Sequence, residues 1–429
     1  MNCIKEETSW IKAGLIRQPI LEQPYRMSTF VIKLQIKDGF LLYNSATGCI
    51  LHFDNEQDLL NSRDTLISNW FLLPTTNFDE FLWIDFLRDK KSELLASKHT
   101  KSYIIMTTMD CNARCFYCYE KGRKPITMTA KTASDLSNFI TENSEKNNTK
   151  LTWFGGEPLL NFKVIDSICT NLHNNGVNFY SHIISNGLLF SENIVKRART
   201  LWHLNRVQIT IDGTEKTYLR IKDYKGHLGN EFQRVICNIE NLLKNNVSVS
   251  IRLNQSLDNT TDLLDLVEYI RDKFPNYAKL SVYNRLLFDE EITNKVQEAY
   301  FDLKHKIMRL GLLKPKYEDP IRFNRCMADS AYAYVVTPNG HLGKCEHFSE
   351  NYLIGTLSDK EFDQQVISQF KEKYENTPLC KTCPLYPSCV RLKMCPSEKE
   401  ECSDFLRDDY LDSIRFMMRE EYNQHIQIN

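Results

Sequence analysis

The sequence has no long apolar run and no excess of charge of either sign. No apolar stretch approaches the about 18 residues of a membrane-spanning helix, and the first ten residues, MNCIKEETSW, lack the apolar segment of a secretory signal. Lys and Arg number 54 against 55 Asp and Glu, which gives no electrostatic case for nucleic acid or an anionic membrane as partner. Solenoid repeats and low-complexity tracts are also missing. We therefore expect a cytoplasmic protein that binds neither nucleic acid nor membranes.

Cysteine is the residue type that the sequence has in excess. The chain of 429 residues contains 14 cysteines, three of them between positions 111 and 118 and seven between 326 and 402. A reducing cytosol argues against a disulfide framework. Clustered thiols in that compartment are better explained by metal or iron–sulfur ligation.

The apolar pattern divides the chain into three predicted domains, at 1–98, 99–319 and 320–429. The first resembles a small α+β unit, with strands at 30–36, 39–43 and 49–53 and helices at 55–68 and 78–97. A winged-helix-like module and a plain appendage to the main domain both fit this order. In the last domain the strand and helix signals weaken while Cys and Pro rise, which indicates a segment organised by metal ligands.

The middle domain alternates regularly between strand and helix patterns. This alternation predicts an α/β domain with a parallel sheet, whose chemistry lies in the loops at the carboxyl ends of the strands. Strands are predicted at 103–108, 150–153, 178–185, 207–211, 247–253 and 279–285, and helices at 129–146, 164–174, 231–244, 261–274 and 296–310.

The loop after the first of these strands contains the spacing C-x3-C-x2-C, on Cys111, Cys115 and Cys118. Three thiolates bind three irons of a [4Fe–4S] cube and leave the fourth iron open for a chelating ligand. The alternative is a structural zinc site, but zinc takes four ligands in such sites. No fourth Cys or His follows nearby.

This motif resembles the signature of the radical S-adenosylmethionine (SAM) enzymes, whose fold is a partial (β/α)6 TIM-like barrel. Further segments match in order: Gly155-Gly156-Glu157-Pro158, Ser185-Asn186-Gly187, Thr210-Ile211-Asp212-Gly213 and Arg252-Leu253-Asn254. Read without the resemblance, these are turns and polar strand ends. The resemblance implies that SAM is bound by Tyr117, Gly155, Gly156, Glu157, Pro158, Ser185, Asn186, Asp212, Arg252 and Asn254.

The C-terminal cysteines resemble the SPASM domain, the auxiliary-cluster module of peptide-modifying radical SAM enzymes. The resemblance implies an outer [4Fe–4S] cluster on four cysteines and an inner one on three, so that three clusters are expected in total. Five residues separate Cys389 from Cys395 where the family pattern has three, and a zinc ribbon on Cys380, Cys383, Cys389 and Cys395 is the alternative. The outer set is Cys380, Cys383, Cys389 and Cys402, and the inner set is Cys326, Cys345 and Cys395.

The resemblance implies an oxidoreductase that cleaves SAM reductively and uses the 5′-deoxyadenosyl radical to take hydrogen from a ribosomally made precursor peptide (a RiPP). A thioether or carbon–carbon cross-link is the expected product, because auxiliary clusters can accept the remaining electron. A flavodoxin or ferredoxin is the expected reductant. The alternatives are an anaerobic sulfatase-maturing enzyme, which makes formylglycine, and a non-catalytic protein that binds peptides and keeps its clusters as structure.

Glu346 is the candidate catalytic base. It directly follows the expected inner-cluster ligand Cys345, where the sulfatase-maturing enzymes carry an aspartate as proton acceptor. A surface glutamate without a chemical role is the alternative, and His347 is a second candidate for the same function. The N-terminal domain resembles, more loosely, the peptide-recognition modules of peptide maturases, which implies that it binds the leader part of the peptide.

Overall fold

The protein is described here from a computed structural model, which covers residues 1–6, 18, 20–95, 100–144, 149–226, 229–315, 319–322, 324–347, 352–396 and 401–428. The chain forms two compact units. The larger unit contains Thr100–Lys314 and Met327–Lys371. The smaller unit contains Met1–His99, Pro315–Cys326 and Glu372–Asn429.

The larger unit is built on a nine-stranded sheet, in the order β12-β11-β10-β9-β8-β7-β13-β14-β15. Its first six strands are parallel and stand in chain order, as the alternating pattern predicted, and the α/β fold class is thereby confirmed. These six strands are β7 (Ser102–Thr108), β8 (Thr149–Gly155), β9 (Phe179–Ser185), β10 (Leu204–Thr210), β11 (Ser248–Gln255) and β12 (Leu280–Leu286).

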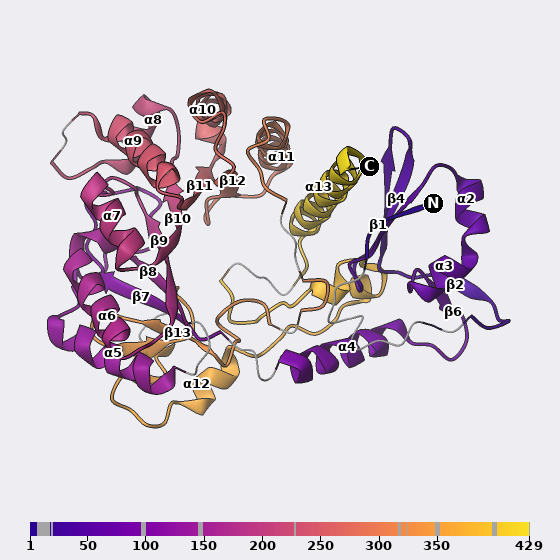
Figure 1. The fold of residues 1–429 in the computed structure, drawn as a ribbon, viewed down its shortest axis with the longest axis horizontal. Helices are drawn as coiled ribbons and strands as arrows, with labels where there is room; N and C mark the ends of the chain where they lie inside the picture. The colour runs from indigo at the N-terminus through magenta and orange to yellow at the C-terminus, as the bar shows by residue number, and fades with distance from the viewer. Residues whose placement is uncertain are drawn as a thin grey trace. The chain divides into compact units, whose positions relative to one another are not determined.

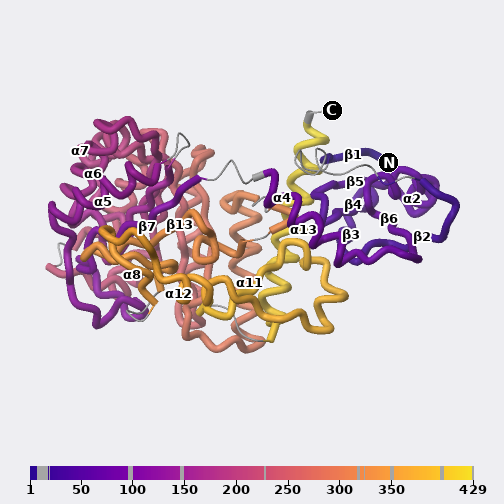
Figure 2. Tube along the Cα trace, turned by 90° about the horizontal axis from the view of Figure 1, so that it is seen from below, coloured from indigo at the N-terminus to yellow at the C-terminus, as the bar shows by residue number. Residues whose placement is uncertain are grey.

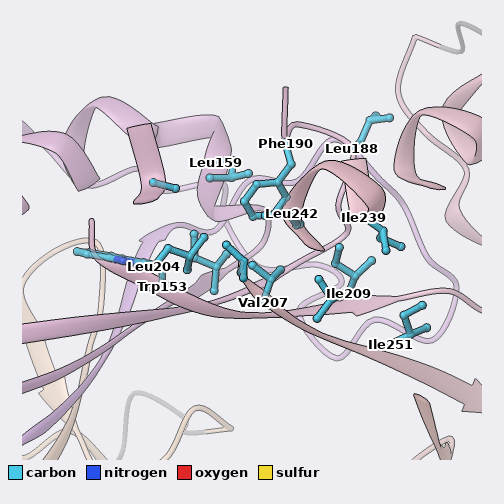
Figure 3. Close-up of a cluster of buried hydrophobic side chains, with 14 of the residues drawn as sticks. Trp153, Leu159, Leu188, Phe190, Leu204, Val207, Ile209, Ile239, Leu242 and Ile251 are labelled. Carbon is cyan, nitrogen blue, oxygen red and sulfur yellow. The ribbon is translucent and has the colours of Figure 1, made fainter. Parts of the chain in front are cut away.

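Helices cover one face of this sheet (Figure 1). Side chains on that face form a large apolar core, in which Trp153, Val207 and Ile251 of the strands meet Ile239 and Leu242 of a helix (Figure 3). The helices are α5 (Ala130–Asn143), α6 (Phe162–Asn174), α7 (Glu192–Thr200), α8 (Glu215–Lys222), α9 (Glu231–Lys244), α10 (Thr260–Lys273), α11 (Asn294–Arg309) and α12 (Gln364–Gln369), with short 3₁₀ turns η1 (Pro158–Asn161) and η2 (Leu257–Asn259).

The opposite face of the six strands carries polar side chains. In β9, for example, Phe179 and Ile183 belong to the apolar core, whereas Tyr180 and His182 are half-buried on the other side. Strands that are covered by helices on both faces read as continuous apolar runs, so this alternation is the pattern of a sheet with helices on one face only.

The edge of the sheet beside β7 is completed by a segment from the C-terminal third of the chain. Strand β13 (Ala333–Val336) pairs in parallel with β7, and β14 (His341–Gly343) and β15 (Gly355–Thr356) follow in antiparallel hairpins. The sequence analysis did not predict these short strands. Their pairing covers an edge of β7 that would otherwise expose unpaired backbone groups.

The smaller unit holds a four-stranded antiparallel sheet in the order β1-β5-β4-β3 and a two-stranded sheet of β2 and β6. Helix α13 lies beside the larger of these sheets in both views (Figure 1, Figure 2). The elements are β1 (Asn2–Lys5), β2 (Tyr25–Met27), β3 (Val31–Ile36), β4 (Gly39–Asn44), β5 (Ile50–Phe53), α2 (Glu56–Asn61), α3 (Arg63–Ser68), β6 (Leu72–Pro74), α4 (Glu80–Leu95), the 3₁₀ turns η4 (Pro378–Thr382) and η5 (Tyr386–Ser388), and α13 (Asp404–Ile428).

The division into units follows packing rather than chain order. The N-terminal segment is an α+β unit, as predicted, but it shares a core with α13, where Met417 and Met418 pack against Ile32, Leu34 and Leu41. The segment 320–429 is divided between both units, and the three-domain division and the winged-helix likeness stay predictions. Among the described residues, no helix is both long and apolar enough to cross a membrane.

Candidate functional site

The loop that follows β7 holds Cys111, Cys115 and Cys118, all half-buried. The backbone of this loop is fixed locally: the Cys118 amide donates to the Cys115 carbonyl over 3.1 Å, and the Ala113 amide donates to Cys111 Sγ over 3.4 Å. Burial raises the pKa of the Cys111 thiol to about 12. A metal ion that binds this thiol must therefore displace its proton.

Two glycines at the end of β8 let the cysteine loop approach closely. A Cβ atom on Gly155 would lie 2.2 Å from the Thr108 carbonyl oxygen, and one on Gly156 would lie 2.3 Å from the Asp110 carbonyl oxygen. The Gly156 amide instead donates to Thr108 over 3.0 Å, and the Glu157 amide donates to Asp110 over 2.9 Å. Pro158 is buried and begins η1 directly after them.

Glu157 is fully buried and joins the ends of β8 and β9. Its carboxylate accepts hydrogen bonds from Ser185 Oγ over 3.0 Å, from the Asn186 amide over 2.9 Å and from the Leu159 amide over 3.2 Å. Burial raises the pKa of Glu157 to about 7, although these donors oppose the shift. The contact of Glu157 with the ammonium group of SAM stays a prediction.

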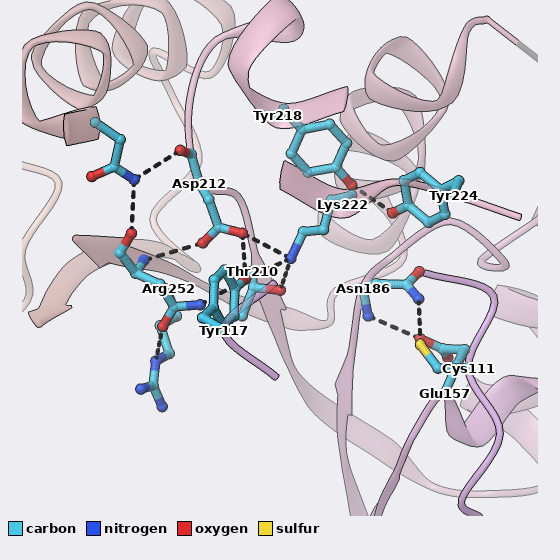
Figure 4. A network of polar contacts seen from close by, with 12 residues as sticks. Cys111, Tyr117, Glu157, Asn186, Thr210, Asp212, Tyr218, Lys222, Tyr224 and Arg252 are labelled. Carbon is cyan, nitrogen blue, oxygen red and sulfur yellow. Dashed lines mark hydrogen bonds and ion pairs between the residues drawn. The ribbon is translucent and has the colours of Figure 1, made fainter. Parts of the chain in front are cut away.

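Tyr117 joins the cysteine loop to the ends of β10 and β11 through a buried polar network (Figure 4). Its hydroxyl donates to Asp212 Oδ2 over 2.5 Å and accepts from Asn254 Nδ2 over 3.1 Å. Lys222 Nζ lies 2.9 Å from the same Asp212 oxygen and donates to Thr210 Oγ1 over 2.6 Å. The loop thereby contacts strands that follow it by about a hundred residues in sequence.

The charges in this network compensate one another. Burial is the largest effect and disfavours the charged form of Lys222, but the Asp212 carboxylate and the other acidic groups around it together outweigh burial and raise the pKa of Lys222 well above its usual range. Burial, together with the same carboxylate, raises the pKa of Tyr117, so that its hydroxyl stays a donor at neutral pH. A fully buried ion pair of this kind depends on both partners being present.

The end of α8 and the segment after it hold the cysteine loop at three further points. The Arg114 amide donates to the Lys222 carbonyl over 2.8 Å, and the Lys225 amide donates to the Asn112 carbonyl over 2.8 Å. Lys225 Nζ also pairs with Asp110 Oδ1 at 2.8 Å. The sequence analysis missed Lys222 and Lys225, because no motif spacing marks them.

Two further predicted site residues, Asn186 and Arg252, lie near the ends of β9 and β11. Asn186 Nδ2 donates to Asn112 Oδ1 over 2.7 Å and lies 3.9 Å from Cys111 Sγ. On β11, Arg252 Nε donates to Asn254 Oδ1 over 2.8 Å. The structure thus brings the loop of Cys111–Cys118, the glycine turn and the ends of β9, β10 and β11 together at the carboxyl edge of one parallel sheet.

A family model matches the part of the chain that forms this site. Residues 105–303 fit the model of the Radical SAM superfamily. This part of the chain matches a radical SAM domain. That superfamily uses a [4Fe–4S] cluster and SAM, which agrees with the cofactors expected from the sequence.

The curated relatives match parts of the chain. An uncharacterized protein of Methanocaldococcus jannaschii is 34% identical over 118 residues, which are 27% of this chain and 40% of the relative. A probable GTP 3′,8-cyclase of Methanococcus vannielii is 27% identical over 33% of this chain and 45% of its own length. The GTP 3′,8-cyclase of Clostridium perfringens is 22% identical over 63% of this chain and 90% of its own length. The chain therefore spans less than half of the first two relatives.

Two solved structures share the fold over longer stretches. The structure of anSMEcpe with bound AdoMet has a TM-score of 0.56 at 14% identity, and the match covers 76% of this chain and 99% of that one. The structure of Streptococcus suis SuiB bound to the precursor peptide SuiA has a TM-score of 0.52 at 12% identity, with 88% and 99% covered. At these identities the likeness shows the fold.

The residues of the radical SAM domain fit the cofactors of the superfamily. Three thiols stand on one loop at the carboxyl edge of the sheet, and the two glycines bring backbone against that loop. Among the described residues, no group of three or more Cys, His, Asp and Glu side chains is arranged to hold a metal ion. The three thiolates of a four-iron cube each bind a different iron, so they need not converge on one point as the ligands of a single metal ion do.

Outside the radical SAM domain, four cysteines of the smaller unit share one cavity of about 700 Å³. These are the cysteines expected to hold the outer auxiliary cluster: Cys380, Cys383, Cys389 and Cys402. Burial raises the pKa of Cys383, and the neighbouring thiols of Cys402 and Cys380 raise it further. Among the described residues that line the cavity, Cys402 is present and Cys395 is not, which favours the outer-cluster set over the zinc set.

Helix α4 contributes the other wall of this cavity, through Asp85, Arg88, Asp89 and Ser92. Arg88 donates to the Tyr386 carbonyl over 2.9 Å and to the Arg322 carbonyl over 3.2 Å. The N-terminal segment is therefore part of the predicted cluster site, a role that its own sequence did not indicate.

The three cysteines predicted to hold the inner cluster belong to different units. Cys326 and Cys395 belong to the smaller unit, and Cys345 belongs to the larger one. The inner-cluster set stays a prediction.

Glu346 lies near the cysteine loop of the radical SAM domain. The ring of the following residue, His347, is 4.3 Å from the ring of Tyr119 and 5.1 Å from that of Phe288. Glu346 itself is half-buried and interacts electrostatically with Tyr119. The role of Glu346 as a base stays a prediction.

A second carboxyl group, that of Glu120, lies directly after the cysteine loop. Burial raises the pKa of Glu120 to about 7, and the sequence analysis did not single this residue out.

Proposed function

We propose that this chain is a radical SAM enzyme that modifies a ribosomally made precursor peptide, with a thioether or carbon–carbon cross-link as the product. When bound, the cluster and SAM supply a 5′-deoxyadenosyl radical that takes a hydrogen atom from a C–H bond of the peptide. The protein supplies the binding, the orientation and the exclusion of water. Cys111, Cys115 and Cys118 hold the cluster in this proposal.

The observation that carries the proposal is the extent of the likeness to SuiB. The match covers 88% of this chain, against 76% for anSMEcpe, and the SuiB structure contains its precursor peptide. This longer coverage supports a precursor peptide as the substrate, although the TM-score is 0.52 for SuiB against 0.56 for anSMEcpe. A non-catalytic protein would not require the buried network that holds the cysteine loop to the ends of β9, β10 and β11.

Each predicted SAM-binding residue has a role in the proposal that its position supports. Gly155, Gly156 and Pro158 shape the wall beside the loop, and Glu157 keeps Ser185 and Asn186 in place. Tyr117, Asp212 and Asn254 fix the far end of the loop, and Arg252 orients the Asn254 amide. The outer auxiliary cluster is held by the cysteines of the cavity in the smaller unit, and a flavodoxin or ferredoxin supplies the electron.

The test is the formation of 5′-deoxyadenosine by the reconstituted protein with dithionite and SAM. Wild type is expected to form it, and the variant with Cys111, Cys115 and Cys118 all changed to Ala is expected to form none. The iron content of that variant should fall by about four per chain, one cube. Unchanged iron content, or no product from fully loaded wild type, would contradict the proposal.

A further inference from the structure

The face of the parallel sheet that lies opposite the helix-covered core carries one basic side chain on each of five consecutive strands. These residues, here called the cationic face, are Lys150 of β8, His182 of β9, Arg206 of β10, Arg252 of β11 and Arg285 of β12. Strands β7 to β12 contain no Asp and no Glu. Because the chain as a whole carries a net charge of −1, this separation of charge is local to the face.

The register of the sheet places these side chains on the same side. His182 pairs with Arg206, and Arg206 pairs with Ser248. Arg252 stands four residues after Ser248 on the same strand, so its side chain points to the same face. Lys150 pairs with Tyr180, two residues before His182, and Asn254 pairs with Arg285. Residues that pair in a parallel ladder, or that stand two apart on one strand, point to the same face. That face lies opposite the helix-covered core.

Contacts between the side chains agree with this register. Arg206 Nη2 donates to Ser250 Oγ over 2.9 Å, and Tyr283 donates to Gln208 Oε1 over 2.7 Å. Burial lowers the pKa of His182 to about 4, and the positive charges of Lys150 and Arg206 lower it further. Neither Lys150 nor Arg206 forms an ion pair with any described residue. These cations therefore repel one another without an acidic partner from the described part of the chain.

We propose that the cationic face binds an acidic segment of the substrate peptide, through carboxylates that pair with Arg206 and Lys150. The inference rests on the proposed function and names the chemistry of its substrate. Arginine binds a carboxylate through two parallel N–H donors, and lysine binds it as a point charge. Opposite charge across a binding surface selects the partner and speeds its approach.

The spacing of the charges favours an extended peptide over a nucleotide. Neighbouring strands stand about 4.8 Å apart, so the charges from β8 to β12 extend over roughly 19 Å across the strands. The register also offsets Arg285 from Lys150 along the strand direction, which spreads the charges further. A triphosphate group needs its cations gathered around one point. Carboxylates distributed along an extended chain match cations that are distributed over β8, β10, β11 and β12, with the neutral His182 of β9 between them.

Binding of fluorescein-labelled hexaglutamate and hexaglutamine to the full-length protein with its clusters and SAM, followed by fluorescence anisotropy, tests the proposal. Hexaglutamate should bind more tightly than hexaglutamine, and the difference should shrink at high ionic strength. Arg206→Gln should weaken hexaglutamate binding roughly tenfold, since a hydrogen-bonded charge is lost. Lys150→Gln should weaken it by less. Lys131→Gln, on the exposed side of α5, is the matched control and should change nothing.

Arg206→Lys keeps the charge and should recover part of the affinity, which separates loss of charge from misfolding. Equal binding of the two peptides, or equal affinity of Arg206→Gln and wild type, would overturn the proposal. Displacement of hexaglutamate by GTP at lower concentration than by unlabelled hexaglutamate would also overturn it, in favour of a nucleotide. The assay requires no reductant. Binding without 5′-deoxyadenosine formation would therefore reject the proposed function alone, and 5′-deoxyadenosine formation without peptide preference would reject only this inference.

Discussion

Lys222 is a single residue on which the position of the cysteine loop depends. Its ammonium group is buried beside Asp212 and donates to Tyr117 and Thr210, while its carbonyl accepts from Arg114. Removing one member of a buried ion pair leaves the other charge without compensation, which costs more than the pair contributes.

Lys222→Met should lower the free energy of unfolding by about 3–5 kcal/mol, because Asp212 stays buried and unpaired. The urea midpoint of the radical SAM domain measures this loss. Lys244→Met, which removes an exposed partner of Glu240 on α9, is the matched control and should change little. The double variant Lys222→Met/Asp212→Leu should recover much of the loss. A single variant as stable as wild type would show that the ion pair is not needed.

The pKa of His182 depends on the positive charges of the cationic face. Burial, Lys150 and Arg206 lower its pKa from 6.5 to about 4, so the folded protein binds fewer protons than the unfolded chain between these values. The stabilising contribution of neutral His182 is present above pH 6.5 and is lost as the pH falls toward 4. Wild type should therefore lose stability relative to His182→Gln over that range.

NMR titration of the histidine rings, with His182→Gln to assign the signal, measures this pKa directly. Arg206→Gln should raise the pKa of His182, because one neighbouring positive charge is removed. Lys131→Gln should leave it unchanged. A pKa near 6.5 in wild type would contradict the crowding of cations on this face.

At the scale of elements, the end of β8 and the cysteine loop fit together because Gly156 has no side chain. Gly156→Ala would place Cβ 2.3 Å from the Asp110 carbonyl, so the loop must shift. We expect a loss of about 1–3 kcal/mol of stability, together with reduced loading of the cluster on Cys111, Cys115 and Cys118, measured as iron and as 5′-deoxyadenosine formed.

The control for this change is Gly176→Ala at the end of α6. Its Cβ would meet nothing within 4 Å, although its φ of +68° strains a side chain there. It should cost about 1 kcal/mol and leave the iron content unchanged. Normal iron loading of Gly156→Ala would show that the close approach of the two backbones is not required.

At the scale of the whole molecule, the N-terminal segment is not a removable module. Its strands cover Met417 and Met418 of α13, and its helix α4 lines the four-cysteine cavity. Deletion of residues 1–98 should therefore expose apolar surface and lower the iron content by about four per chain, one cube.

Iron and sulfide analysis of the deleted protein, compared with the full chain, checks this expectation. Cys380→Ala with Cys383→Ala in the full chain is the control that removes the same predicted cluster without removing α4. If the shortened protein keeps all of its iron and stays monomeric, the segment is independent of the auxiliary site.

The sequence by itself determined the parallel sheet and the position of the cysteine loop, because both depend on local signals. Apolar alternation marked the six strands to within a few residues, and the spacing of Cys111, Cys115 and Cys118 marked the loop. Helix α13 was also readable in principle from apolar residues at helical spacing, such as Leu411, Ile414 and Met418.

The tertiary structure decided which distant residues complete the site. Lys222 reaches Tyr117 across 105 positions, β13 pairs with β7, and α4 lines the cavity of Cys380 and Cys402. The cationic face follows from the register of five strands, each of which contributes one unremarkable basic residue. Such partners are selected by packing between segments far apart in the chain, and no local spacing in the sequence records that selection.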